Sequence, residues 1–164
     1  MLENVKIEDV LFLDIETVPK SADYHQLNEI ERDLWDEKKG KHRNEEETEA
    51  YFYFNNAGIY AEFGKIICIS VGYFQSAGMF QEFEIVSFYG DDEKKLLSDF
   101  SQFLQNQLKI NRNKTICGHN VREFDVPYIC RRMLMNQLKL PNYFESLQAK
   151  KPWEIGLLDS MDWW

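Results

Sequence analysis

The sequence predicts an α/β domain in which a mixed sheet is flanked by helices, with a helical insertion after the first strand. Two observations predict this class. Short apolar runs rich in β-branched residues recur along the chain as strands, and a long apolar stripe at helical spacing separates the third run from the fourth. With 164 residues, of which 44% are hydrophobic and 15% aromatic, the chain can bury an ordinary core, so one domain is expected.

The predicted strands cover residues 10–16, 65–75, 79–89, 114–117 and 155–159. Pro19 ends the first strand, and the turn at residues 76–78 joins the second and third strands into an antiparallel hairpin. Asp91 and Asp92 then open a helix whose apolar residues recur at i, i+3, i+4 and i+7 over four turns. This helix is expected to cover one face of the sheet.

Residues 20–63 form the predicted insertion. The segment is charged and helix-prone, and an acidic run at residues 45–47 precedes an aromatic cluster at residues 51–54. The favoured interpretation is a helical insertion packed at the edge of the domain. The alternative is a flap over a cleft, in which the aromatic side chains stack on unpaired bases.

Two acids lie two residues apart inside the apolar run of the first strand. Because alternate side chains of a strand share a face, Asp14 and Glu16 should point the same way while Leu13 and Ile15 pack into the core. Two carboxylates held this close repel each other unless a cation lies between them, and hard oxygen ligands suit Mg²⁺ or Mn²⁺ better than Zn²⁺. The pair indicates either a divalent-metal site or an edge strand with a solvated acidic face.

A second acidic element follows the fourth predicted strand. The apolar residues after it recur at helical spacing, and Pro127 fits only the first turn of that helix because proline has no amide hydrogen. Asp125 therefore lies at or just before the start of the helix. There it would either cap free backbone N–H groups at the positive end of the helix dipole or face the strand acids as a third metal ligand.

These two elements resemble the first two motifs of the DEDD, or DnaQ-like, 3′-5′ exonucleases, which have an RNase H-like fold. Residues 14–17 read Asp-Ile-Glu-Thr, and Asn120, Phe124 and Asp125 form the second motif. The three-residue gap between Asn120 and Phe124 is similar to the proofreading domains of family-B DNA polymerases. Residues 61–72 are similar to stand-alone predicted exonucleases related to those domains, and the resemblance covers residues 9–159.

The resemblance implies a metal-dependent 3′-5′ exonuclease that hydrolyses phosphodiester bonds at single-stranded 3′ ends, with DNA favoured over RNA. Asp14 would contact both Mg²⁺ or Mn²⁺ ions, Glu16 the ion that activates water, and Asp125 the other ion. Two ions about 3.5 to 4 Å apart stabilise both the attacking and the leaving oxygen.

Substrate contacts are implied for three residues of the two motifs, namely Thr17, Asn120 and Phe124. From the residues alone, Thr17 is a strand-end residue and Asn120 a turn former. Further contacts are expected from basic residues, although the net charge of −9 is unusual for a protein that binds phosphates. Residues 1–108 carry 10 Lys+Arg against 22 Asp+Glu, whereas residues 109–164 carry 9 against 6. A solvated helix face explains most of this basic excess, and Arg131 and Arg132 are the candidates for phosphate contact.

The sequence departs from the superfamily in one respect. Relatives supply a fourth acid from a late helix, in a Tyr-x-x-x-Asp or His-x-x-x-x-Asp motif whose Tyr or His orients or deprotonates the attacking water. No such motif follows Asp125 here. We therefore expect a single exonuclease-like domain over residues 1–164 that lacks its C-terminal helices and is catalytically incomplete. Asp159 is expected to have a structural role at a strand end rather than that of the fourth acid.

Two other functions stay open. One is a catalytically inactive nucleic-acid-binding module on the same fold, which the three retained acids oppose. The other is a protein-interaction scaffold built on the acidic insertion. A polymerase or repair protein is the partner that the resemblance implies. Because the sequence has no apolar run near the ~20 residues of a membrane span and no signal peptide, a cytoplasmic protein without membrane contact is expected.

Overall fold

The computed structural model describes residues 5–39, 44, 46–77, 80–148 and 156–163. The chain divides into two compact units, one made of residues 1–16 and 67–164 and the other of residues 17–66. Among the described residues, none of the helices is long and apolar enough to cross a lipid bilayer.

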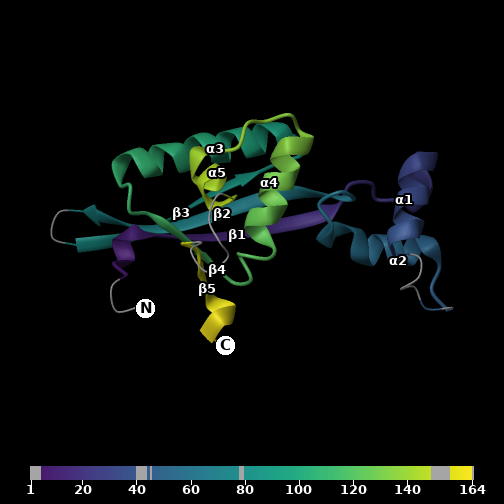
Figure 1. The fold of residues 1–164 in the computed structure, drawn as a ribbon, viewed down its shortest axis with the longest axis horizontal. Coiled ribbons are helices and arrows are strands. Elements are labelled where there is room, and N and C mark those ends of the chain that lie inside the picture. The colour runs from purple at the N-terminus through teal and green to yellow at the C-terminus, as the bar shows by residue number, and fades with distance from the viewer. Residues whose placement is uncertain (1–4, 40–43, 45, 78–79, 149–155, 164) are drawn as a thin grey trace. The chain divides into compact units, whose positions relative to one another are not determined.

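Five strands form one sheet in the order β3-β2-β1-β4-β5 (Figure 1). Their bounds are β1 (Val10–Pro19), β2 (Gly64–Ala77), β3 (Phe80–Tyr89), β4 (Thr115–Gly118) and β5 (Leu158–Asp159). β2 and β3 are antiparallel, as the turn between them predicts, whereas β4 is parallel to both β1 and β5. The sheet is therefore mixed. The fifth strand was predicted over residues 155–159, and its described part is shorter, since only Leu158 and Asp159 pair with β4.

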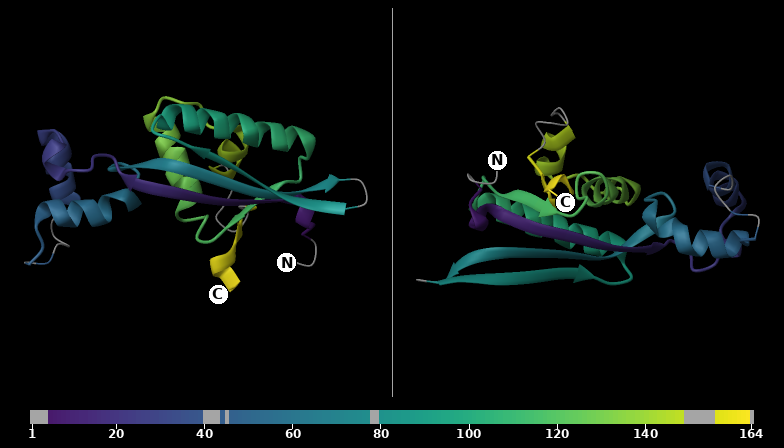
Figure 2. Two further views of the ribbon diagram at one scale, coloured as in Figure 1. Left: turned by 180° about the vertical axis from the view of Figure 1, so that it is seen from behind. Right: turned by 90° about the horizontal axis from the view of Figure 1, so that it is seen from below.

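Three helices of the first unit lie on one side of this sheet: α3 (Glu93–Ile110), α4 (Asp125–Met135) and α5 (Asn142–Gln148) (Figures 1 and 2). Asp92 caps α3, because its carboxylate accepts the N–H of Lys95 at 3.0 Å. The ring of Phe88 on β3 lies 6.0 Å from Phe100 and 5.5 Å from Phe103 on α3. The predicted helix thus covers one face of the sheet.

The two faces of the sheet differ in burial. On β2, Ile69, Val71 and Tyr73 are buried beneath the helices. The opposite side, which we call the open face, carries Phe83 and Ile85 of β3, which are 48% and 66% exposed. Single exposed apolar side chains are common on protein surfaces, but Phe83 and Ile85 line one cavity together with Phe12.

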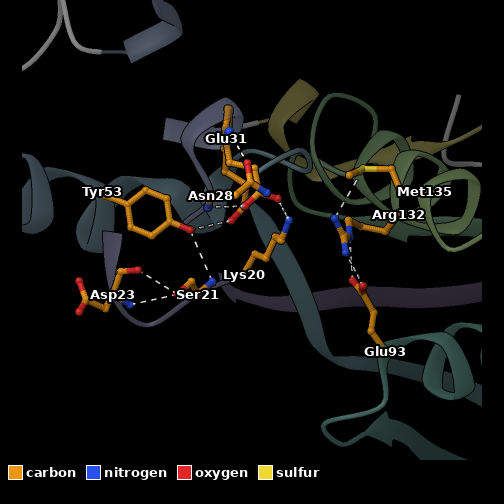
Figure 3. A network of polar contacts seen from close by, with 10 residues as sticks. Lys20, Ser21, Asp23, Asn28, Glu31, Tyr53, Glu93, Arg132 and Met135 are labelled. Atoms are coloured by element: carbon orange, nitrogen blue, oxygen red, sulfur yellow. Dashed lines mark hydrogen bonds and ion pairs between the residues drawn. The ribbon is translucent and has the colours of Figure 1, made fainter. Parts of the chain in front are cut away.

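The second unit has its own apolar core. It contains the helices α1 (Glu29–Lys39) and α2 (Glu49–Asn56) together with two short 3-10 turns, Tyr24–Gln26 and Ala57–Ile59. Trp35 is 1% exposed and lies with its ring 5.1 Å from Phe63 and 5.2 Å from Tyr53. A Lys20–Glu31 ion pair and a contact from the Ser21 N–H to the Tyr53 hydroxyl lie at its edge (Figure 3).

The aromatic cluster at residues 51–54 divides between core and surface. Phe52 and Tyr53 are buried in the core of the second unit, whereas Tyr51 and Phe54 are 61% and 58% exposed. Stacking of this cluster on unpaired bases stays a prediction, and it would depend on Tyr51 and Phe54.

Gly118, the last residue of β4, permits a close approach to β1. A Cβ atom at this position would lie 2.7 Å from the backbone oxygen of Leu13, and a backbone atom cannot move aside as a side chain can. We expect Gly118→Ala to lower the free energy of unfolding by about 1–3 kcal/mol. Urea denaturation measures this. Gly156→Ala is the matched control, because a Cβ there would meet nothing within 4 Å. Equal stability of the two variants would contradict the close approach.

Candidate active site

The centre of β1 presents its two acids on one face. Asp14 and Glu16 are exposed, while Leu13 and Ile15 between and beside them are 4% and 7% exposed. This is the alternation that an extended strand imposes on a run of mixed polarity. The two carboxylates therefore leave the core in the same direction.

Asp125, the first residue of α4, is brought to the same stretch of β1. Its Oδ1 atom accepts the backbone N–H of Ile15 at 3.2 Å, and the residue is only 3% exposed. The ladder between β1 and β4 runs as far as Phe12 opposite Cys117, so the N–H of Ile15 lies beyond it. At Ile15, the residue between Asp14 and Glu16, the carboxylate of Asp125 thus accepts the N–H that a neighbouring strand would otherwise bind.

The loop before α4 fixes the position of Asp125. Asn120 adopts a left-handed backbone, with φ of 59°, which asparagine tolerates better than most residues. Its carbonyl oxygen accepts the N–H groups of Glu123 at 3.2 Å and Phe124 at 2.8 Å. Asn120 therefore shapes the motif loop through its backbone, and its predicted contact with substrate stays a prediction.

Asp159 at the end of β5 holds this loop from the other side. Its carboxylate accepts the backbone N–H groups of Asn120 at 2.8 Å, Arg122 at 3.0 Å and Met161 at 3.1 Å. Burial alone would raise the pKa of Asp159, but these donors and the Arg122 guanidinium outweigh it and keep that pKa below its usual value. These contacts give Asp159 a structural role, which is to hold the loop before α4. The Arg122 side chain also pairs with Asp162 at 3.0 Å, a contact that no sequence pattern indicated.

The pKa of Asp125 moves in the opposite direction. Burial raises the pKa of this carboxyl to about 6, and the negative charges of Asp14 and Asp159 add to the shift. Only the contact from Ile15 and its own backbone N–H oppose this. Ionised Asp125 is therefore a buried anion beside other anions, the environment in which a divalent cation stabilises the charged form.

The donor set suits a hard divalent cation, since Asp14, Glu16 and Asp125 offer carboxylate oxygens and one of them is buried without a cationic partner of its own in the described contacts. The three side chains are not gathered into a ready-made site. Within the part of the chain that the structure describes, no three His, Cys, Asp or Glu side chains are placed to hold a metal ion. The three-acid metal site stays a prediction.

The two arginines predicted to contact phosphate differ in environment. Arg131 is exposed, whereas Arg132 is 7% exposed and forms a bidentate pair with Glu93 on α3, with Nε–Oε1 and Nη2–Oε2 distances of 2.8 and 2.5 Å (Figure 3). Asn136 donates to the same carboxylate at 2.9 Å. Arg132 therefore joins α4 to α3, and phosphate contact is better expected from Arg131.

Two other predicted substrate contacts lie in different surroundings. Thr17 is half-buried on β1 and belongs to the second compact unit. Phe124 is half-buried immediately before α4, with its ring 5.4 Å from that of Tyr128. Their contacts with substrate stay predictions.

His119 was not among the site residues predicted from the sequence. The structure places its Nδ1 atom 2.9 Å from the hydroxyl of Ser160, in a cavity that Asp14 also lines. The available signal was its position directly after the fourth predicted strand, two residues after Cys117, which lies opposite Phe12 of β1.

The raised pKa of Asp125 predicts a pH-dependent stability in the presence of a chelator. In the folded chain this carboxyl holds its proton up to about pH 6, whereas in the unfolded chain it ionises near its ordinary value of 3.8. The stability present below pH 3.8 is therefore lost as the pH rises through about 6, by about 3 kcal/mol for a shift of this size. Asp125→Asn should remove the loss. Urea denaturation should show the variant gaining stability over the wild type between about pH 4 and about pH 7.5.

Asp159→Asn is the control for this experiment, because the pKa of Asp159 is lowered and the sign reverses. That variant should lose stability relative to the wild type as the pH rises. A stability difference between Asp125→Asn and the wild type that is the same at both pH values would contradict the raised pKa.

Comparison with known proteins identifies the family. The family model for the exonuclease domain of DNA polymerase family B matches residues 9–157. No curated protein sequence matches the chain significantly. A solved structure, the family B DNA polymerase from the hyperthermophilic archaeon Pyrobaculum calidifontis, is similar at 16% identity over 80% of this chain, with a TM-score of 0.43; this chain covers 11% of that polymerase chain. With a family match over most of its length and the mixed α/β sheet of an RNase H-like exonuclease, the chain belongs to the family of exonuclease domains of family B DNA polymerases.

Proposed function

We propose that this chain is a metal-dependent 3′-5′ exonuclease domain that hydrolyses phosphodiester bonds at single-stranded 3′ ends of DNA. The observation that carries the proposal is the contact between Asp125 Oδ1 and the N–H of Ile15, at 3.2 Å. It links the second acidic motif to the residue between the two acids of the first. The family match over residues 9–157 supports the same chemistry.

In the proposed site, Asp14, Glu16 and Asp125 hold Mg²⁺ or Mn²⁺. Two such ions, when bound, activate a water molecule and neutralise charge on the attacking and leaving oxygens. Two features of the chain position Asp125 for this proposed role. The Ile15 N–H orients the Asp125 carboxylate, and the Asn120 loop, capped by Asp159, holds the start of α4 against β1.

The substrate and the partner are also proposals, and the family match supports them. The polymerase relationship favours DNA over RNA and a polymerase or repair protein as partner. Exposed Arg131 on α4 is the basic residue that we assign to a substrate phosphate.

A second candidate is a binding module that keeps the fold but does not cleave. Two observations favour it. In the described residues the acids are not assembled into a metal-holding group, and no Tyr or His precedes an Asp at motif spacing after residue 125. The retention of Asp14, Glu16 and Asp125 favours the exonuclease, because a pure binding surface does not need three adjacent acids.

Cleavage separates the two candidates. A 5′-labelled single-stranded oligonucleotide with Mn²⁺ should be shortened from its 3′ end, slowly, because a missing water-positioning residue costs a factor of about 10² to 10⁴ in rate. Asp14→Asn and Asp125→Asn should each abolish the remaining activity, as resolved on a denaturing gel after long incubation.

Glu123→Gln is the matched control for the cleavage experiment. It removes an exposed acid from the same motif loop, two residues before Asp125, and should cleave like the wild type. Cleavage that survives in Asp14→Asn would point to a contaminating nuclease. Oligonucleotide binding without shortening, in the wild type as in the variants, would favour the binding module.

The environments of the two arginines predict different defects. Single-strand affinity should fall as salt rises, because each Lys or Arg at a phosphate releases a counterion. Arg131→Ala should reduce the slope of log K against log salt by about one, because one phosphate contact is lost, and should leave the stability of the fold unchanged. Arg132→Ala should instead destabilise the fold by about 3–5 kcal/mol, since it removes the cationic partner of the buried Glu93 carboxylate. Fluorescence anisotropy with Ca²⁺ and urea denaturation measure the two effects; the opposite assignment of defects would contradict the structure.

A further inference from the structure

β3 forms one border of the sheet (Figure 2). Among the described strands, β2 is its only neighbour, and the ten residue pairs between the two strands are consecutive. Natural border strands are usually short, bulged, or protected by Pro or Lys, because their free N–H and C=O groups can pair with another strand. The sequence of β3, residues 80–89, contains no Pro, Lys or Arg. β3 is therefore able to accept a further strand.

The backbone groups that face away from β2 belong to every second residue of β3. The N–H of Gly90, directly after the strand, donates to the carbonyl of Ile67 at 3.2 Å. In an antiparallel ladder, hydrogen-bonded pairs alternate with pairs that are not bonded, so the even-numbered residues of β3 bond to β2. The N–H and C=O groups of the odd-numbered residues, which include Ile85, Ser87 and Tyr89, therefore point out of the sheet.

The two halves of β3 differ in chemistry. The first half carries two acids, Glu82 and Glu84, whereas the second half is neutral. Ile85 and Tyr89, on the open face, are 66% and 79% exposed. A strand that pairs with the second half therefore meets apolar side chains, while one that pairs with the first half must accommodate two carboxylates.

We propose that residues 85–89 pair antiparallel with the same segment of a second copy of the chain, so that two sheets become one. The two-fold axis passes through Ser87, which lies opposite its own counterpart. On the open face, Ile85 of each copy lies opposite Tyr89 of the other. On the face that the helices cover, Val86 lies opposite Phe88. The outward N–H and C=O groups of both segments then pair with each other in about six backbone hydrogen bonds.

Charge selects this register among the symmetric pairings. An axis at any of residues 82–84 would set carboxylates opposite one another, which is destabilising. An axis at residue 85 or 86 would set Glu84 opposite an apolar side chain, and an axis after Ser87 would shorten the pairing. With the axis at Ser87, Glu84 lies opposite Gly90, and Glu82 lies outside the paired segment. The segment is thus complementary to itself, as a two-fold interface requires.

The interface is small, and the inference does not depend on the proposed function. Residues 85–89 of two copies bury less than the roughly 800 Å² per partner of a standard interface, so we expect a dissociation constant of about 10 to 100 μM. Ile85 also lines the cavity that Asp14 lines, so the interface borders the candidate active site. The three predicted metal ligands lie outside residues 85–89, and cleavage can therefore fail or succeed independently of dimerisation.

Sedimentation equilibrium between about 5 and about 500 μM tests the pairing. The wild type should change from monomer to dimer over this range. Ser87→Pro should stay monomeric and keep its urea denaturation midpoint, because the N–H that proline lacks points away from β2. A wild type that stays monomeric throughout overturns the proposal and leaves β3 to a strand of another protein. A dimer that survives in folded Ser87→Pro also overturns it.

Two charge variants test the register without changing the backbone. Ile85→Lys and Tyr89→Glu alter side chains that are exposed in the monomer, so both should fold. Each should weaken the dimer about tenfold, since the altered pair occurs twice across the axis. The double variant sets an amine opposite a carboxylate in both pairs and should restore the wild-type dissociation constant. A double variant that dimerises more weakly than either single variant would overturn the register.

Disulfide cross-linking tests where the axis lies. Residues opposite each other in a hydrogen-bonded pair have Cα atoms about 5.5 Å apart, which is within the range of a disulfide. Ser87→Cys should therefore form a covalent dimer under mild oxidation, above the baseline of the wild type with its three cysteines. Gln81→Cys is the matched control, because this exposed residue lies on the same face of β3 but its two copies would be about 40 Å apart. Equal cross-linking of the two variants would contradict the proposed pairing.

Discussion

The hydrogen bond from the Ile15 N–H to Asp125 Oδ1 is the contact on which the rest of the site depends. It joins the centre of β1 to the start of α4 across 110 residues of sequence. The bond forms because β1 continues past its last partner on β4, so the Ile15 N–H has no carbonyl acceptor on that strand and the Asp125 carboxylate accepts it instead. The left-handed turn at Asn120 and the N–H contacts of Asp159 then hold α4 at the right place.

Two buried carboxyl groups near this contact have pKa values that are shifted in opposite directions, because their surroundings differ. Asp159 and Asp125 are each 3% exposed. Asp159 is surrounded by N–H donors, so its pKa is lowered and it is a stable anion. Asp125 has burial and the charge of Asp14 against it, so its pKa is raised to about 6. Of these two carboxylates, Asp125 is the one whose ionised form a bound cation would stabilise. For this reason Asp125, and not Asp159, is assigned to the proposed metal site.

Local patterns predicted those features that depend on neighbours in sequence. The alternation of Asp14 and Glu16 with buried residues and the position of Asp125 at a helix start follow from strand and helix periodicity. Features that depend on distant pairs were missed. The role of Arg132 is set by Glu93, 39 residues away, and the close approach of the Phe83 ring to β2 is permitted by Gly72 on that strand. No period or motif encodes such contacts, since only the register of the fold creates them.

Direct titration of Mn²⁺ into the protein at about pH 7.5 tests the central claim, that Asp14, Glu16 and Asp125 serve one cation site. Calorimetry should detect binding to the wild type and to Glu123→Gln with the same affinity. Loss of a ligand should weaken binding by at least about tenfold in both Asp14→Asn and Asp125→Asn. Binding to Asp125→Asn as tight as that to the wild type would show that the buried carboxylate does not take part, and would contradict the account.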